Sequence, residues 1–250
     1  MVSTTLLHQK PISLKIDIDY QGEEETTLRH LVLQQFHGIE TLSEPFEYTV
    51  LMISDDPAIN FSDMVGKKVT ISLDCHDKRG SEGISSQEES PKIRYFNGVI
   101  GQFTQLHTAH KSDDNVTYYE AKIYPQFWML KFTQDCRIFQ HQSAMDIIKQ
   151  VLQENGVLKI EDKTKDCGHL PREYCVQYNE SSFDFISRLL EEEGIFYYFK
   201  HTHGQHTLVL GEAPSSHEDC PGAKTAEFEK AVSGVDYFNK LITCKVLERV

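Results

Sequence analysis

The chain has 250 residues, of which 39% are hydrophobic and 10% aromatic, and its formal net charge is −13. This length and composition predict a globular protein with a sizeable core in one or two domains, and they exclude a disordered chain. The acidic balance, without a cluster of Lys and Arg, argues against nucleic acid and anionic membranes as partners, and no segment reaches the roughly 20 apolar residues of a membrane span.

The N-terminal segment and the cysteines indicate the compartment. Residues 1–20 contain no charged stretch that leads into an apolar run long enough for a signal peptide. We therefore expect synthesis in the cytoplasm and no export by a cleaved signal. The six cysteines form no CxxC pair, so we expect reduced thiols instead of a disulfide framework.

Strand patterns dominate the chain. Residues 13–20 and 68–75 alternate apolar and polar side chains, with the period of two that a half-buried strand produces. Gly98 and Gly101, which lie inside a further apolar run, predict bulges or sharp curvature, as at the corner of a barrel. The other β-rich runs are 46–54, 94–106, 117–124, 195–200 and 206–210.

The segment 76–92 interrupts these strands. It is polar, rich in Ser and Glu, and has no apolar period. We expect a mobile hairpin at the surface, and a docking loop is the alternative, because long loops often carry function.

Two helices are predicted, near residues 144–155 and 182–193. Each begins with a capping serine that is followed by an aspartate three positions later, and each ends at a glycine suited to a left-handed stop. The two helices share a spacing of 38 residues, which fits duplicated ancestry or one set of capping rules; the second explanation is favoured because the flanking sequence does not repeat. The capping and ending residues are Ser143 and Gly156 for the first helix and Ser181 and Gly194 for the second.

An acidic, aromatic stretch spans residues 174–200. Within the predicted helix, Glu191, Glu192 and Glu193 are about 100° apart, so their carboxylates fan outward and do not converge on one bond. They oppose the helix dipole, a small cost that Arg188 relieves in part. We interpret the run as a solvated or interface face.

Two carboxylates at the start of this helix raise an alternative. Glu180 and Asp184 share a face, which suits an acid hydrolase that uses Trp128 as a platform for a sugar ring. Their position favours a helix cap and the dipole over catalysis, and Trp128 is more typical of a core residue. A carbohydrate-binding module centred on Trp128 is the weakest alternative. We expect no enzyme and no catalytic residues.

The strand after the helix carries aromatic side chains on both faces over residues 195–199. Such a strand is buried on both sides, or buried on one side and covered by another subunit. Together with the loop at 201–205 and the run 206–210, it predicts a helix followed by a hairpin.

The sequence contains two groups of potential metal ligands. His201, His203 and His206 form an HxHxxH pattern in the hairpin, but no nearby Cys or carboxylate completes a familiar site. A second group matches no standard zinc module and contains Cys167, His169 and Cys175. Nucleotide-binding, nucleophile-elbow and zinc-protease motifs are absent from the sequence. We therefore expect no metal and no cofactor.

Several motifs together resemble VgrG, the spike protein of bacterial type VI secretion, and the baseplate hub proteins of contractile phage tails. The most specific motif is YCVQYNESSFDFISRLLEEEGIFYYF, at residues 174–199. The resemblance runs from about residue 28 to residue 210. The other segments that carry it are 36–54, 64–73, 94–103 and 118–152.

The resemblance implies a non-catalytic hub with an α+β, mostly β fold. In that family the region builds two β-barrel-like hub (tube) domains with inserted α/β elements. Three copies form a ring of pseudo-six-fold symmetry that docks on the hexameric tail-tube protein Hcp and contacts the baseplate. Later parts of such chains carry an OB-fold, a β-helical needle, a PAAR-type tip protein and effectors. The implied protein is assembled in the bacterial cytoplasm and leaves through type VI secretion.

The expected domain organisation follows the same resemblance. We expect a first barrel-like domain over residues 1–135, which includes the 76–92 loop, and an α+β hub region over residues 136–250. No needle-forming run of short Val, Ile and Thr strands is present, so we expect either an N-terminal piece of a longer spike or a shortened hub paralogue. The hub of a phage or phage-like contractile tail is the alternative function.

Overall fold

The computed structural model describes residues 13–18, 31–74, 93–110, 115–157, 159–164, 169–218, 227–228 and 240–241. The predicted surface loop at 76–92 lies outside the described residues, as do Cys75, Cys167, Cys220 and Cys244. The chain divides into two compact units, Met1–Glu212 and Ala213–Val250.

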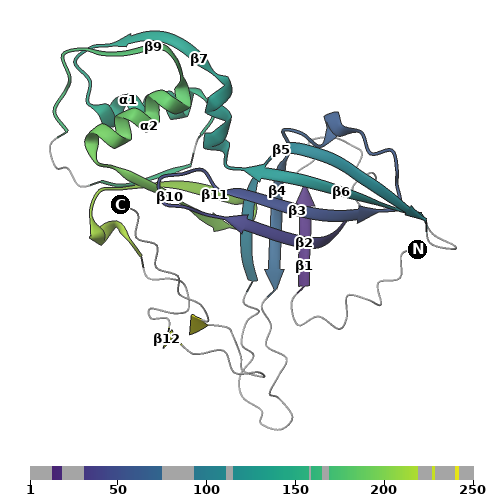
Figure 1. Ribbon diagram of the computed structural model, residues 1–250. Coiled ribbons are helices and arrows are strands. Elements are labelled where there is room, and N and C mark those ends of the chain that lie inside the picture. Colours follow the sequence, from purple (N-terminus) through teal and green to yellow (C-terminus); the bar gives the residue numbers. More distant parts are fainter. Residues whose placement is uncertain are drawn as a thin grey trace, which may run out of the picture. The chain divides into compact units, whose positions relative to one another are not determined.

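The first unit contains a six-stranded antiparallel sheet with the strand order β1-β4-β5-β6-β3-β2. The sheet is strongly curved, and its two edge strands, β1 and β2, approach each other (Figure 1). Within the described residues this is the barrel-like part of a mostly β, α+β fold, which confirms the predicted fold class. The strands are β1 (Ser13–Ile18), β2 (Val32–Ile39), β3 (Glu47–Ser54), β4 (Lys68–Asp74), β5 (Ile93–His110) and β6 (Asn115–Tyr124).

The core of this sheet is built by alternation along its central strands. In β3 every second side chain is fully buried, because the period of two sends these residues to the inner face. β6 repeats the pattern beside it, and the short 3-10 helix Phe61–Asp63 follows β3. The innermost side chains are Tyr48, Val50, Met52, Tyr119, Ala121 and Ile123.

The two glycines of β5 have different roles. The register of β5 against β6 shifts between Ile100 and Gln102, so the predicted bulge lies at Gly101. Gly98 lies in regular register, and it is needed for close approach, because a Cβ there would be 2.7 Å from the carbonyl oxygen of Tyr124. Of the predicted bulges or sharp curvature, the bulge is confirmed at Gly101, while Gly98 lies in regular register and allows close approach of the strands.

The remainder of the first unit is an α+β layer. A two-stranded antiparallel ribbon, β7–β9, lies over α1 and α2, while β8 pairs parallel with β11 in the sheet β10-β11-β8 (Figure 1). Apolar faces of both helices form a second core with the 3-10 helix Gln126–Phe132. The elements are β7 (Gln134–Phe139), α1 (Ala144–Glu154), β8 (Ile160–Lys163), β9 (Cys175–Ser181), α2 (Ser182–Glu193), β10 (Phe196–Thr202) and β11 (Gln205–Gly211).

Both helices begin and end as predicted. The hydroxyl of Ser143 accepts the amide N–H of Asp146, and the hydroxyl of Ser181 accepts that of Asp184. The two glycines that follow the helices have left-handed backbones, with φ of +78° at Gly156 and +71° at Gly194. Local capping chemistry therefore sets the limits of these helices.

The second unit is described only in part. It contains the 3-10 helix Pro214–Ser216 and two short parallel strands, β12 (Glu227–Phe228) and β13 (Lys240–Leu241). Among the described residues of the whole chain, none of the helices has the length and apolar character needed to cross a membrane.

Candidate assembly surface

A partly buried hydrogen-bond chain joins the β10–β11 hairpin to the six-stranded sheet. His201 accepts the backbone N–H of Asn97 at Nδ1, at 3.0 Å, and its Nε2 lies 3.0 Å from the hydroxyl of Tyr48. Because Nδ1 accepts, the proton of the neutral ring is on Nε2, which donates to Tyr48. Tyr48 in turn donates to Glu40, and its burial, followed by this carboxylate, raises the pKa of the phenol.

His206, directly opposite His201 in the hairpin, makes a second junction contact. Its Nε2 accepts the backbone N–H of Gln126 at 3.0 Å. Burial lowers the pKa of His201 to about 3 and that of His206 to about 4, so both rings are neutral at physiological pH. The two imidazoles therefore act as acceptors for backbone N–H groups.

Two of the three histidines of the HxHxxH pattern, His201 and His206, are thus occupied by backbone N–H groups. His203, the third member, is exposed at the turn and packs edge-on against Tyr95. His169 pairs with Glu193, and Cys175 is buried with a free thiol. Across the part of the chain that the structure describes, no group of three or more His, Cys, Asp or Glu side chains is placed to hold a metal ion.

Asn97 fixes the hairpin turn to the sheet. Its amide nitrogen donates to the carbonyl oxygens of Thr202 and Gln205 at 2.7 and 2.8 Å, and its amide oxygen accepts the hydroxyl of Thr70 at 2.8 Å. The Asn97 side chain is 3% exposed, so these bonds satisfy it fully inside the protein. No sequence motif marks this residue, because its two hairpin acceptors, the carbonyl oxygens of Thr202 and Gln205, are more than 100 positions away.

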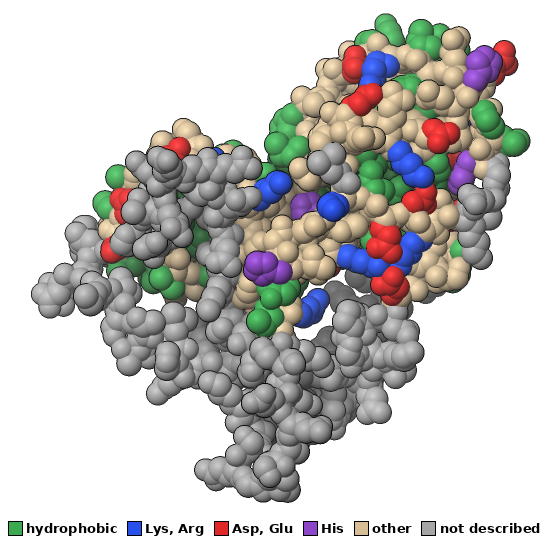
Figure 2. Space-filling view, turned by 180° about the vertical axis from the view of Figure 1, so that it is seen from behind, with side chains coloured by type: hydrophobic (Ala, Val, Ile, Leu, Met, Phe, Trp, Pro, Cys, Tyr) green, Lys and Arg blue, Asp and Glu red, His purple; other side chains and the backbone are tan. Residues whose placement is uncertain are grey.

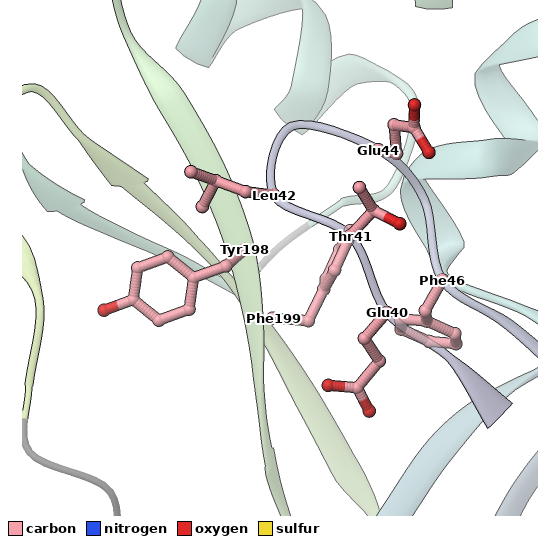
Figure 3. Close-up of a pocket in the computed structure, with 7 residues that line it drawn as sticks. All are labelled: Glu40, Thr41, Leu42, Glu44, Phe46, Tyr198 and Phe199. Atoms are coloured by element: carbon pink, nitrogen blue, oxygen red, sulfur yellow. The ribbon is translucent and has the colours of Figure 1, made fainter. Parts of the chain in front are cut away.

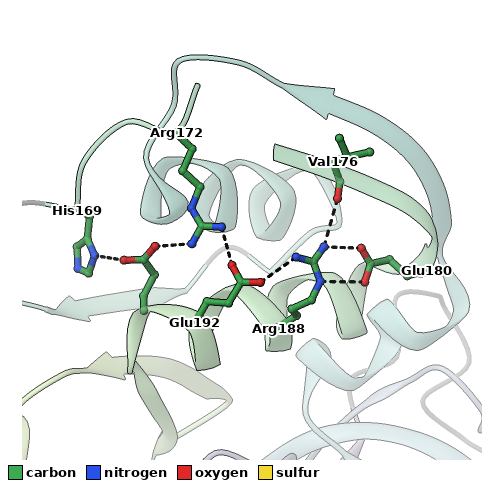
Figure 4. A network of polar contacts seen from close by, with 7 residues as sticks. His169, Arg172, Val176, Glu180, Arg188 and Glu192 are labelled. Atoms are coloured by element: carbon green, nitrogen blue, oxygen red, sulfur yellow. Dashed lines mark hydrogen bonds and ion pairs between the residues drawn. The ribbon is translucent and has the colours of Figure 1, made fainter. Parts of the chain in front are cut away.

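The acidic run of α2 is held in an ion-pair network (Figure 4). Arg188 contacts Glu180 at 2.7 Å and Glu192 at 3.1 Å, and it also donates to the carbonyl oxygen of Val176. These contacts place the positive charge of Arg188 beside the acidic run, where it was predicted to offset part of the cost of the helix dipole. Its bonds to Glu180 also raise the pKa of the Arg188 guanidinium.

A second arginine extends the network. Arg172 contacts Glu192 at 2.6 Å and Glu193 at 2.5 Å, and Glu193 also lies 2.7 Å from Nδ1 of His169. Hydrogen bonds from Arg172 lower the pKa of both carboxyl groups. The loop before β9 is thereby tied to the end of α2, a contact that the sequence did not predict.

The residues of the hydrolase alternative have structural partners. Asp184 accepts the hydroxyl of Ser181 at 2.7 Å as part of the helix cap, while Glu180 is bound by Arg188. Trp128 is half-buried, and one face of its ring stacks on Tyr124 with ring centroids 4.1 Å apart. The aromatic platform is thus partly covered by the protein itself.

Exposed apolar side chains collect on the β7–β9 ribbon. We call its outward side the ribbon face; in Figure 2, hydrophobic side chains gather along the upper margin, over these strands. Tyr178 is 78% exposed and Ile138 60% exposed, although both are large. Exposed apolar patches of this kind are typical of contact surfaces. The ribbon face consists of Cys136, Ile138, Tyr174, Val176 and Tyr178.

A pocket lies between the β2–β3 turn and strand β10, and we call it the turn pocket (Figure 3). A backbone hydrogen bond connects the turn to β10, because the N–H of Ser43 donates to the carbonyl oxygen of Tyr197 at 2.9 Å. Ser43 has a left-handed φ of +61°. Leu42 at the tip of the turn is 52% exposed. The lining residues are Glu40, Thr41, Leu42, Glu44, Phe46, Tyr198 and Phe199.

A protein family described as phage tail baseplate hub (GPD) matches residues 39–240, most of the chain and both cores described above. The chain belongs to the phage tail baseplate hub family. The predicted resemblance to hub proteins is therefore confirmed.

Curated relatives of this hub chain include spike proteins. Type VI secretion system spike protein VgrG1b of Pseudomonas aeruginosa is 38% identical over 191 residues, which are 76% of this chain and 23% of the relative. VgrG1a of the same species is 38% identical over 192 residues, 77% of this chain and 27% of the relative. The actin cross-linking toxin VgrG1 of Vibrio cholerae is 31% identical over 84% of this chain and 18% of its own length. The hub chain thus spans about a quarter of the first two relatives.

Solved structures share the fold. The c3393 protein of E. coli, described as a component of the type VI secretion system similar to the T4 tail proteins gp27 and gp5, has a TM-score of 0.64 at 23% identity, over 82% of this chain and 50% of its own. A chain of a Francisella PdpA-VgrG complex has a TM-score of 0.54 at 10% identity, over 81% of this chain and 31% of that one. These likenesses establish the hub fold.

Proposed function

We propose that the chain is the hub region of a type VI secretion spike. The observation that carries this proposal is the 38% identity to VgrG spike proteins over three quarters of the chain, within the matched hub family. In this role three copies form a ring, the ring docks on the hexameric tube protein Hcp beside the baseplate, and the spike helps to deliver effectors into target cells.

The geometry supports a role as an assembly part. The ribbon face and the β2–β3 turn expose large apolar side chains, as contact surfaces often do. Trimeric ring interfaces are heterologous, so different patches of one copy meet on the next. The proposed boundary near residue 135, between a barrel-like part and an α+β part, belongs to the same proposal.

Catalysis is not part of the proposed role. The carboxylates considered for hydrolysis cap a helix and pair with arginine, and the hairpin histidines accept backbone N–H groups. We assign any effector, and any PAAR-type tip protein, to parts of the spike beyond the hub region. Assembly in the cytoplasm and secretion through the type VI apparatus without a cleaved signal complete the proposal.

The hub of a phage or phage-like contractile tail is the second candidate. It is favoured by the description of the matched family as a phage tail hub and by the fold shared with a protein that resembles T4 tail proteins. Both candidates use the same fold as a ring segment, and they differ in the tube protein that the ring contacts.

The test is an assembly experiment on the full-length protein that contains this hub chain. Light scattering is expected to show a trimer, and a strict monomer over a wide concentration range would contradict the proposal. The trimer is then mixed with Hcp from the same bacterium and, in parallel, with a phage tail-tube protein. Co-sedimentation with Hcp alone supports the spike, whereas binding only to the phage tube supports the second candidate.

A further inference from the structure

The β10–β11 hairpin joins the two cores of the first unit. It leaves the α+β layer and reaches the six-stranded sheet, where both of its strands contact β5 (Figure 1). The Phe199 side chain of β10 packs against the core of the helices and also against the core of the sheet. The bonds that hold the hairpin on the sheet therefore also hold the two cores together.

Two histidines anchor the hairpin by the same kind of bond. His201 accepts the backbone N–H of Asn97 in β5, and His206 accepts that of Gln126, at the start of the 3-10 helix after β6. A backbone N–H can only donate, so each ring has to offer a lone pair. A protonated imidazole carries a hydrogen on both nitrogens and has no free lone pair, so rotating the ring cannot restore the bond. Each anchor exists only while its histidine is neutral.

The surroundings of the two rings also oppose protonation. Burial is the main cause of the lowered pKa of both histidines. The ring centroids are 6.2 Å apart, so a positive charge on His206 lowers the pKa of His201 further. The nearby charged side chains act in the same direction, Arg94 of β5 on His201 and Lys68 of β4 on His206. A proton on either ring therefore disfavours the closed hairpin.

The nearest carboxylate does not compensate a proton on His201. Glu40 accepts the hydroxyl of Tyr48, and Tyr48 lies between Glu40 and the ring. Within the described residues, neither His201 nor His206 pairs directly with an acidic side chain, whereas His169 contacts Glu193. The two junction rings thus lack the partner that would stabilise their charged form.

We propose that His201 and His206 form a proton-operated latch, which releases the β10–β11 hairpin from the six-stranded sheet in mild acid. The released hairpin binds one more proton on each ring than the closed hairpin, so two protons drive the opening. The two cores separate at the hairpin, and each keeps its own packing. The side-chain bonds from Asn97 to the hairpin turn do not titrate, so they set how far the pH has to fall and not how many protons are taken up.

The direction and steepness of the response follow from the two rings. Both have a lower pKa in the closed hairpin than the ordinary 6.5, so the latch is complete above that pH and weakens as the pH falls toward about 4. Uptake of two protons raises the equilibrium constant for opening by up to about 100-fold per pH unit, whereas one proton gives at most about tenfold. The steepness therefore counts the histidines that act together.

Hydrogen–deuterium exchange of single amides, followed by NMR from about pH 6.5 to about pH 4.5, measures this opening. After correction for the intrinsic exchange rate, protection of the Asn97 and Gln126 amides should fall by roughly 50- to 100-fold per pH unit below about pH 5.5. At each pH it should stay below the protection of the Leu189 amide in the core of α2, because the hairpin opens before the helices unfold. Equal protection at all three amides, or a fall of about tenfold or less, would overturn the proposal.

Two variants and a control assign the protons to the rings. His201→Gln and His206→Gln each keep an acceptor for the backbone N–H and remove one titrating group, so each should reduce the fall to about tenfold per pH unit at both amides. His203→Gln replaces the exposed histidine at the hairpin turn, outside the junction, and should keep the steepness of the parent chain. If one junction variant fails to fold, the other still tests the coupling. An unchanged steepness in a folded junction variant would disprove the latch, whether or not the chain forms a spike.

Discussion

The hairpin junction and the α2 network stabilise neighbouring parts of one unit by opposite means. At the junction, neutral groups make short bonds mainly to backbone atoms; Asn97 is buried, and His201 and His206 are half-buried. In the network, the charged groups of Arg172 and Arg188 pair with glutamates and remain partly open to solvent. Buried polar contacts are costly to break, whereas exposed ion pairs contribute little and are screened by salt. Disrupting the junction should therefore lower the free energy of unfolding more than disrupting the network. The two losses should also depend differently on pH and on salt concentration.

The largest effect is expected from Asn97→Ala. The substitution leaves the carbonyl oxygens of Thr202 and Gln205 without their donor and removes the acceptor of Thr70, all at a buried position. We expect the free energy of unfolding to fall by about 3 kcal/mol, measured by urea denaturation. Gln35→Ala, which truncates an exposed amide on β2, should change it by less than about 0.5 kcal/mol. Equal effects would show that the junction is not a buried contact.

The junction should also respond to mild acid. Each histidine has a lower pKa in the folded chain than the ordinary 6.5, so its contribution is complete above pH 6.5 and is lost as the pH falls, toward about 4 for His206 and about 3 for His201. The glutamates of the network also have lowered pKa values, but their contribution is lost only below the ordinary 4.5. The interval from pH 6.5 to about 4.5 therefore reports on the junction.

His206→Gln tests this window, because Gln keeps an acceptor for the N–H of Gln126 and does not titrate. The stability difference between the parent chain and the variant should shrink by about 2 kcal/mol between pH 6.5 and pH 4, as measured by urea unfolding at several pH values. Parallel curves for the two proteins would mean that His206 is protonated equally in the folded and unfolded chains.

A smaller effect is expected in the network. Arg172→Met keeps the apolar stem but removes the guanidinium that pairs with Glu192 and Glu193, and we expect a loss of about 1 kcal/mol at low salt. Raising the salt to about 1 M should halve this loss, because the side chains are partly exposed. The Asn97→Ala loss should not change with salt. If the loss of stability for Arg172→Met does not depend on salt, the ion pairs of the network are shielded from solvent like the contacts of the junction.

The elements that the sequence predicted are those set by neighbouring residues, and the ones it missed depend on residues far away in the chain. Local rules were sufficient for the helices, because Ser143 and Ser181 cap them through neighbours three positions away. The same local rules did not predict the β7–β9 ribbon. β7 is short, polar and mostly exposed, so its side chains show no period of two. The strand β2 was missed for a related reason, because the register shift between Leu33 and Gln35 breaks its alternation.

The contact sites were harder to predict than the elements. The Tyr48–His201 contact spans 153 positions, and neither residue lies in a motif that pairs them. The histidines were recognised from their spacing, yet their role as acceptors depends on the backbone N–H groups that the folded sheet presents to them. The turn pocket likewise depends on β10 lying under the β2–β3 turn. Such sites arise from tertiary pairing and leave no local pattern.

The smallest effects on stability are expected at Glu180 and Asp184, the two carboxylates of the hydrolase alternative. Glu180→Gln keeps an acceptor for Arg188, and Asp184→Asn keeps the Ser181 cap of α2, so each should lower the free energy of unfolding by only about 0.5 kcal/mol. Because both groups act through the helix, neither variant should alter release of products from peptidoglycan, measured by chromatography on the parent chain and both variants. A turnover in the parent chain that both substitutions abolish, with stability intact, would move these residues from the structural network to a catalytic pair.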